Sequence, residues 1–284
     1  MWFFDALASG FQYPTDPARL QWFRVAFATV LTARFALALG QGGWDRLVPG
    51  SLSAHLAEQR FGPARARLLT TVYRPALIVR TGAAVALALG LAPRLALLAV
   101  LAGAAMELLY LRSPNAVRYT LLTGTALLLA QDLGHGLVIR HGSSTANTWA
   151  QCLMIMITTD IYWNSAWHKL RSPQFRSGLY LAQWIHTYTQ VREQLPYRRQ
   201  YAVPGLVRRY AGGLTDRDVR LWRAVAACVI AAEIALPPAL LIEQTMPYAV
   251  VAGIAMHAAF TCLKARQLIT FTGLTLATYL AFAA

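Results

Sequence analysis

Residues 84–111 read AVALALGLAPRLALLAVLAGAAMELLYL, two apolar runs separated by the short connection Ala92-Pro93-Arg94. This pattern predicts two hydrophobic helices joined in a tight hairpin. Comparable apolar segments recur along the chain, and each approaches the length that a transmembrane helix needs. We therefore expect an all-α fold, a polytopic integral membrane bundle of about eight transmembrane helices that forms a single domain over residues 1–284. The expected helices lie near residues 19–40, 75–92, 94–111, 116–133, 148–169, 221–242, 246–263 and 265–283.

The composition supports a membrane protein. The chain is 57% hydrophobic and 13% charged, and its mean hydropathy is +0.42, whereas soluble domains carry about 25% charged residues. The net charge of +14 comes from arginines that gather in the loops between apolar segments, chiefly 41–74 and 170–220. Such loops indicate topology and anionic lipid headgroups rather than nucleic acid. We expect the lipid bilayer as a partner, no nucleic acid, and a multi-pass protein of the bacterial inner membrane. The three cysteines lie far apart and form no metal motif.

Two local patterns modify this simple picture. The first part of the polar stretch 170–220 is amphipathic, with Leu179, Ala182, Gln183 and His186 on one side and Tyr180, Trp184 and Thr187 on another. It predicts an interfacial helix with an aromatic anchor. Pro237-Pro238 interrupts the sixth apolar segment. Proline lacks an N–H, so we expect a kink and freed backbone carbonyls that a neighbour or water must satisfy.

The apolar segments also contain ionisable residues. Burying an isolated charge in lipid costs about 2.5–3.5 kcal/mol even on the lenient insertion scale, so these side chains should pair inside the bundle or line a wet cavity. We expect a structural ion pair such as Arg34 or Arg80 with Glu107. His257 alone is more often a hydrogen-bonded core histidine than a base. The full set comprises Arg24, Arg34, Arg80, Glu107, Arg118, Asp132, Asp160, His168, Lys169, Glu233 and His257.

Lys169 stands out among them, because the chain has two lysines against twenty-four arginines. An arginine stays protonated at any working pH, whereas a partly desolvated lysine can lose its proton and act as a base. The plainer interpretation is a codon bias toward arginine, with this lysine reaching toward a lipid headgroup. Both interpretations fit the spacing of the residues.

A polar stripe surrounds this lysine. On a helix, Asp160, Asn164 and His168 share one face, Ser165 and Lys169 share the adjoining face, and Tyr162 stands about one turn before Ser165. Trp163 and Trp167 flank the stripe, a position typical of an aromatic belt at the membrane interface. The stripe is equally suited to a catalytic base.

The stretch from Tyr162 to Gly178 resembles a segment of the vitamin K-dependent γ-glutamyl carboxylases and their bacterial relatives, the HTTM membrane proteins. In that family an apolar helix ends in a tyrosine, a small pair and a lysine-leucine, followed by an aromatic residue and a glycine that opens the next helix. Weaker matches are Phe23-Arg24 in the first apolar segment and Gly253 to His257 in the seventh. The positions that carry the main match are Tyr162, Ser165-Ala166, Lys169-Leu170, Phe175 and Gly178.

The resemblance implies a specific chemistry. In the carboxylases the lysine deprotonates reduced vitamin K, the reaction with O2 drives removal of a proton from a peptide glutamate, and CO2 then adds. Lys169 would inherit the role of base, and His257 and His168 would be further catalytic candidates. Tyr162, Asn164 and Trp167 would contribute to a site for reduced vitamin K or menaquinol between membrane helices. The implied substrate is a secreted peptide or a small acid, and the implied enzyme class is a carboxylase-like lyase.

Three departures from the family pattern keep a second function open. The carboxylases carry a large extramembrane region for the peptide, whereas this sequence stops at Ala284, directly after its last apolar segment. His168 stands where the animal enzymes would have a lysine. The arginine-rich loops place Lys169 toward the cytoplasm, whereas the carboxylases act on the lumenal side. The alternative is a non-catalytic membrane protein, similar to the sporulation-delaying-protein B branch, that matures or exports a secreted peptide toxin.

Overall fold

The computed structural model describes residues 14–41, 47, 52–110, 115–191, 203–263 and 265–282. In these ranges the regular structure is helical, and the bridge between Thr15 and Ser144 is an isolated one. The all-α prediction is confirmed. The chain divides into two compact units, unit 1 (Met1–Ile155) and unit 2 (Met156–Ala284). The single domain expected over residues 1–284 stays a prediction.

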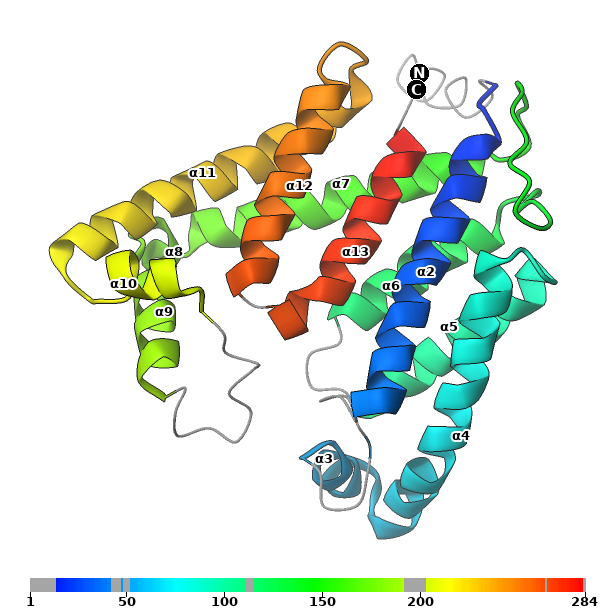
Figure 1. The fold of residues 1–284 in the computed structure, drawn as a ribbon, viewed down its shortest axis with the longest axis horizontal. Coiled ribbons are helices and arrows are strands. Elements are labelled where there is room, and N and C mark those ends of the chain that lie inside the picture. Colours follow the sequence, from blue (N-terminus) through cyan, green and yellow to red (C-terminus); the bar gives the residue numbers. More distant parts are fainter. Residues whose placement is uncertain are drawn as a thin grey trace. The chain divides into compact units, whose positions relative to one another are not determined.

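Unit 1 is built on antiparallel helices that pack in chain order (Figure 1). Helix α4 contacts both α2 and α5, and α5 contacts α6, while the short α3 lies against α4 and α5. The connection from α4 to α5 is as tight as the sequence indicates, because α4 ends at Ala88 and α5 begins at Pro93. The helices are α2 (Ala18–Gln41), α3 (Leu52–Phe61), α4 (Pro63–Ala88), α5 (Pro93–Tyr110), α6 (Asn115–Leu128) and the first part of α7 (Thr148–Arg171).

A fully buried arginine fastens one end of unit 1. Arg24 of α2 donates from Nη1 to the carbonyl of Gly134 at 2.9 Å and from Nη2 to that of Gly136 at 2.7 Å. Gly90, in the turn after α4, has φ +69 and accepts a hydrogen bond from Gly136 N. A Cβ on Gly90 would meet Gly136 N at 2.4 Å, so only glycine permits this approach. Backbone carbonyls thus serve here as the partners of a buried cation.

An ion triplet ties α2, α4 and α5 together. Arg80 Nη1 lies 2.7 Å from Glu107 Oε1, and Arg34 Nη2 lies 3.1 Å from Glu107 Oε2. The Arg80 guanidinium also stacks over the ring of Phe35, 4.2 Å from its centroid. Gly103 makes room for it, since a Cβ there would meet Arg80 Cδ at 2.0 Å. The expected pairing is confirmed, and both arginines take part in it.

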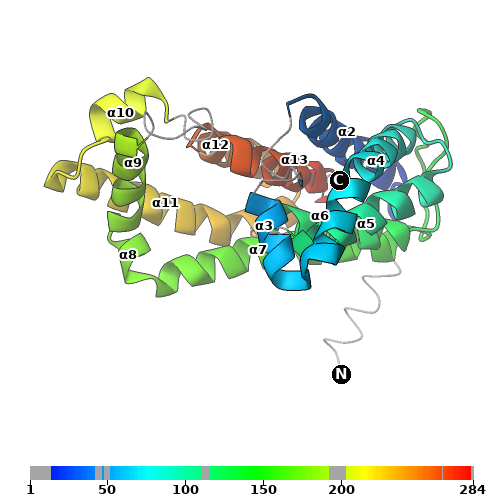
Figure 2. The same cartoon turned by 90° about the horizontal axis from the view of Figure 1, so that it is seen from below.

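Unit 2 contains the remainder of α7 and six further helices (Figures 1 and 2). Helix α11 contacts α8, α9, α10, α12 and α13, and α12 packs against α13. A capping box of Thr215 and Asp218 begins α11, which satisfies backbone N–H groups at the helix start. The helices are α8 (Pro173–Arg176), α9 (Leu179–Val191), α10 (Gly205–Ala211), α11 (Asp216–Leu241), α12 (Met246–Leu263) and α13 (Ala265–Phe282).

The helix expected in the polar stretch is α9, and the structure adds which of its residues are buried. Its buried residues are Ala182 and Ile185, which form a core cluster with Trp222 of α11. Trp184 packs against that cluster, whereas Gln183 is exposed. Gly178, with φ +79, precedes α9, and a Cβ on it would meet Arg223 N at 2.2 Å. This glycine lets the backbone before α9 touch the backbone of α11, and that contact decides which face of α9 is buried.

Each of the eight expected apolar segments corresponds to a helix, but eight membrane spans are not confirmed. Among the described residues, three helices are long and apolar enough to cross a bilayer: Ala18–Gly40, Asp216–Leu241 and Met246–Leu263. Leu268–Phe282 is apolar but shorter. Helix α6, with 14 residues, extends about 21 Å, less than the roughly 30 Å of a hydrocarbon core. Helix α7 is long but is not among the three, because its polar side chains lower its mean hydropathy.

The ion triplet predicts a stability defect in Glu107→Gln. The substitution leaves the buried Arg80 and the partly buried Arg34 without their carboxylate, and an uncompensated buried charge costs about 3–5 kcal/mol. We expect a clear loss of folded yield and of thermal stability in detergent. Glu58→Gln, on the exposed surface of α3, is the matched control and should behave as wild type. Equal stability of the two variants would contradict the structural role of the triplet.

Candidate functional site

The candidate site is centred on a lysine–glutamate ion pair between α7 and α11. Lys169 Nζ donates to Ser165 Oγ at 2.9 Å and to Glu233 Oε1. Ser165 Oγ in turn donates to the same Oε1 at 3.0 Å. The side chain of Lys169 is 20% exposed and that of Glu233 only 4%. The helical spacing of four residues places Ser165 beside Lys169, and Glu233 of α11 completes the group.

Aromatic rings enclose the remaining sides of the ammonium. Lys169 Nζ lies 5.6 Å from the ring centroid of Phe175 and 5.7 Å from that of Phe260. Both distances fall within the range of a cation–π interaction. Phe175 belongs to α8 and Phe260 to α12. The ion pair between α7 and α11 therefore has aromatic neighbours from two further helices, and an apolar surrounding strengthens its electrostatic interaction.

The double proline of α11 lies one turn beyond Glu233. Pro238 has no N–H to donate to the carbonyl of Ile234, and Trp163 Nε1 of α7 donates to that carbonyl at 3.2 Å instead. The freed carbonyl predicted from Pro237-Pro238 thus has a neighbour as its partner. This bond joins α7 to α11 at the residue after Glu233, and on α7 its donor lies about one and a half to two turns before Lys169. It fixes the register that brings Lys169 to Glu233.

A second polar cluster joins α7, α12 and α13. Tyr162 Oη forms a hydrogen bond with His257 Nε2 at 2.7 Å and another with the hydroxyl of Tyr279. His257 is buried, and its Nδ1 has no hydrogen-bond partner among the described residues. Gly253 makes room for the cluster, because a Cβ there would meet the Tyr279 hydroxyl at 2.2 Å. If Nε2 accepts from Tyr162, then Nδ1 carries the imidazole proton and is a buried donor.

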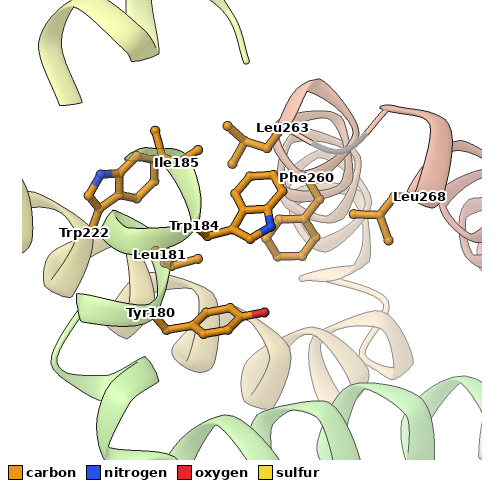
Figure 3. A pocket seen from close by; sticks show the side chains of 8 residues that line it. All are labelled: Tyr180, Leu181, Trp184, Ile185, Trp222, Phe260, Leu263 and Leu268. Atoms are coloured by element: carbon orange, nitrogen blue, oxygen red, sulfur yellow. The ribbon is translucent and has the colours of Figure 1, made fainter. Parts of the chain in front are cut away.

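An apolar pocket lies beside these groups, between α9, α11, α12 and α13. Figure 3 shows Phe260 facing Trp184 across it, with Leu263 and Leu268 along one wall. The cavity measures about 90 Å³. Phe260 is the shared element, since its ring also contacts Lys169 and lies 6.1 Å from the His257 ring, centroid to centroid. The lining residues are Tyr180, Leu181, Trp184, Ile185, Trp222, Phe260, Leu263 and Leu268.

The structure divides the six residues predicted from sequence into two groups. Lys169 belongs to the ion pair, and Tyr162 and His257 contact each other in the buried cluster. His168, Asn164 and Trp167 are instead exposed on the other side of α7. The guanidinium of Arg171 lies over the ring of Trp167, with its Cζ atom 4.8 Å from the ring centroid. The helical period explains the split, because neighbouring residues point about 100° apart.

Sequence reasoning missed the partners of these residues. The sequence marks Glu233 only as one of several charges in apolar segments, and it gives no sign of Tyr279 or Phe260. Glu233 is 64 residues away from Lys169, and no local pattern links them. The one available signal is the scarcity of acids in the apolar segments, which makes each acid a candidate partner for a buried cation.

Comparisons with known proteins do not identify a relative. No family model, no curated protein and no solved structure matches the chain. The resemblance to the carboxylase family therefore stays a prediction, supported only by the residues that carry it.

The buried cluster predicts that Tyr162→Phe is destabilising. Loss of the hydroxyl leaves His257 Nε2 and the Tyr279 hydroxyl each without this partner, and an unsatisfied buried group costs about 1–3 kcal/mol. Thermal unfolding in detergent should show the loss. Tyr180→Phe removes a hydroxyl from a side chain that is 46% exposed and should change little. Equal melting temperatures for these two variants would argue against the cluster.

Proposed function

We propose that this chain is a multi-pass protein of the bacterial inner membrane, with about eight transmembrane helices and an interfacial α9, and that it is an enzyme of the quinol-dependent carboxylase type. Its substrate would be a secreted peptide or a small acid. The observation that carries the proposal is the position of Phe260. One face of the site is a protonatable ion pair, Lys169 with Glu233, and the other is an aromatic-lined apolar pocket, and this single ring contacts both.

Membrane location rests on the three long apolar helices and on the exposed apolar side chains that they carry. In α12, Tyr248, Val251 and Ile254 are exposed, and large exposed apolar patches mark contact with lipid or with a partner. These faces are compatible with contact with a lipid bilayer. The remaining five apolar segments are proposed to complete the bundle by tilting or by lying partly in the interface.

A lipid-soluble quinol suits the apolar side of the site. The cavity of about 90 Å³ is smaller than the roughly 150 Å³ cavity that admits benzene in an engineered protein. It therefore suits part of an apolar chain, and a two-ring head enters only if Phe260 or Trp184 turns aside. Reduced vitamin K or menaquinol would supply reducing equivalents and, with O2 and CO2, the carboxylating chemistry.

The residues of the chain would bind and move a proton. Lys169 and Glu233 form the only ion pair in the described part of unit 2, and removal of either would abolish proton transfer at this site. In the tautomer whose Nε2 accepts from Tyr162, His257 Nδ1 is a buried donor without a hydrogen-bond partner among the described residues, and it would orient an acceptor oxygen of the ligand. His168, Asn164 and Trp167, proposed from sequence, would contribute only from the exposed side of α7.

Mass spectrometry of secreted peptides tests the proposal. We expect cells with the wild-type gene to produce a peptide or small acid with a modification that Lys169→Met abolishes when products are compared at equal amounts of folded membrane protein. A gain of about 44 Da on a glutamate would identify carboxylation. Arg171→Met is the matched control, because it removes an exposed cation from the same helix end, and the modification should persist in it.

Identical products from wild type and Lys169→Met would overturn the enzymatic proposal. In that case the maturation or export of a peptide toxin, independent of Lys169, becomes the better account.

A further inference from the structure

The two oxygens of the Glu233 carboxylate have different surroundings. Oε1 accepts from both Lys169 Nζ and Ser165 Oγ. Oε2 is fully buried and has no hydrogen-bond partner in the described part of the chain. A carboxylate oxygen offers two lone pairs, and leaving it buried and unsatisfied is costly. One half of this carboxylate is therefore available to a donor that the protein does not itself supply.

Lys169, the other member of the pair, differs from Glu233 Oε2 because its ammonium has several partners. Its Nζ donates to Ser165 Oγ and to Glu233 Oε1, and two aromatic faces lie within cation–π distance. Each of these contacts uses an N–H of the ammonium or its positive charge. An ammonium has three donors and no lone pair, so it accepts no proton. With the ion pair intact, the available base is the carboxylate.

We infer that Glu233 Oε2, rather than Lys169 Nζ, is the atom that accepts the hydroxyl hydrogen of a bound quinol-type ligand. The inference rests on the proposed function. The ligand O–H bond breaks and an O–H bond forms on Oε2, so the ligand becomes an anion and Glu233 becomes neutral. Lys169 keeps its proton and is left beside the new anion as its counter-charge. Lys169 would thus stabilise the product of the proton transfer without taking the proton.

The other ionisable groups nearby do not replace Glu233 in this role. Asp160 and His168 are exposed on the other side of α7. His257 Nε2 is occupied by Tyr162, and when it accepts from that hydroxyl, Nδ1 carries the imidazole proton and accepts none. Ser165 already donates to Oε1. Among the described residues around Lys169, Glu233 Oε2 is the one buried carboxylate oxygen without a hydrogen-bond partner.

A pair of probe ligands tests the inference without a known substrate. 2-Methyl-1-naphthol presents the hydroxyl of a reduced quinone, and its methyl ether has the same rings without that donor. Equilibrium dialysis against protein in lipid nanodiscs, with empty nanodiscs subtracted, gives both affinities. We expect wild type to prefer the naphthol about tenfold, the size of one hydrogen bond to a charged group. In Glu233→Gln the preference should fall toward unity while the ether still binds.

Glu233→Gln separates the two possible bases. If Lys169 were the base, its amine would still be present in Glu233→Gln to accept the hydroxyl hydrogen, and the preference for the naphthol would survive. That result would overturn the inference. Ser165→Ala leaves Oε2 untouched and should keep the wild-type preference. Its loss in Ser165→Ala would also count against Oε2.

The same binding experiment, with two further variants, tests whether the probes bind in the apolar pocket. Leu181→Trp fills the cavity and should abolish binding of both probes, whereas Leu206→Trp, at a position 72% exposed in α10, should not. Wild-type protein that binds neither probe contradicts the proposed quinol site as a whole. Wild-type protein that binds both probes equally keeps the pocket and contradicts the role of Glu233.

Discussion

Every buried charge in this protein needs a partner, because an apolar environment provides no water to solvate it. Three different solutions meet that requirement. Arg34 and Arg80 share Glu107, Arg24 binds two backbone carbonyls, and Lys169 pairs with Glu233. Each solution joins elements that are distant in sequence. The first solution links α2, α4 and α5 in unit 1, and the last links α7 and α11 in unit 2.

Glycines make these polar contacts possible. Gly103 leaves the space that the Arg80 side chain fills, Gly253 leaves that of the Tyr279 hydroxyl, and Gly178 lets backbone meet backbone before α9. Small residues allow close approach of helices in membrane proteins, and polar groups then bond across the interface. The double proline acts in a different way, because it leaves the carbonyl of Ile234 without a helical donor and Trp163 donates to that carbonyl instead. On α11, this double proline lies one helical turn from Glu233, the partner of Lys169.

Local periodicity predicted much of this structure. All eight apolar segments are helices, and the pairing of Glu107 followed from its being an acid among arginines. The exposed side of α7 also follows from the helical period: Asp160 precedes Lys169 by nine residues, or about two and a half turns, so the two point to opposite sides. Long-range contacts were beyond the sequence. Nothing in α7 specifies Glu233 as the partner of Lys169, and the buried face of α9 depends on where Gly178 meets α11.

The resulting site has one protonatable and one apolar side, which is what a lipid-soluble ligand with a reactive hydroxyl requires. Its central element is the coupling between Lys169 and Glu233. A double-mutant cycle of thermal stability in detergent measures that coupling directly, with Lys169→Met, Glu233→Gln and the double variant. Contacting residues typically couple by about 0.5–3 kcal/mol. We predict that each single variant is less stable than wild type and that the double variant regains part of the loss, because no buried charge is then left alone. Additive losses would contradict the ion pair and the site built on it.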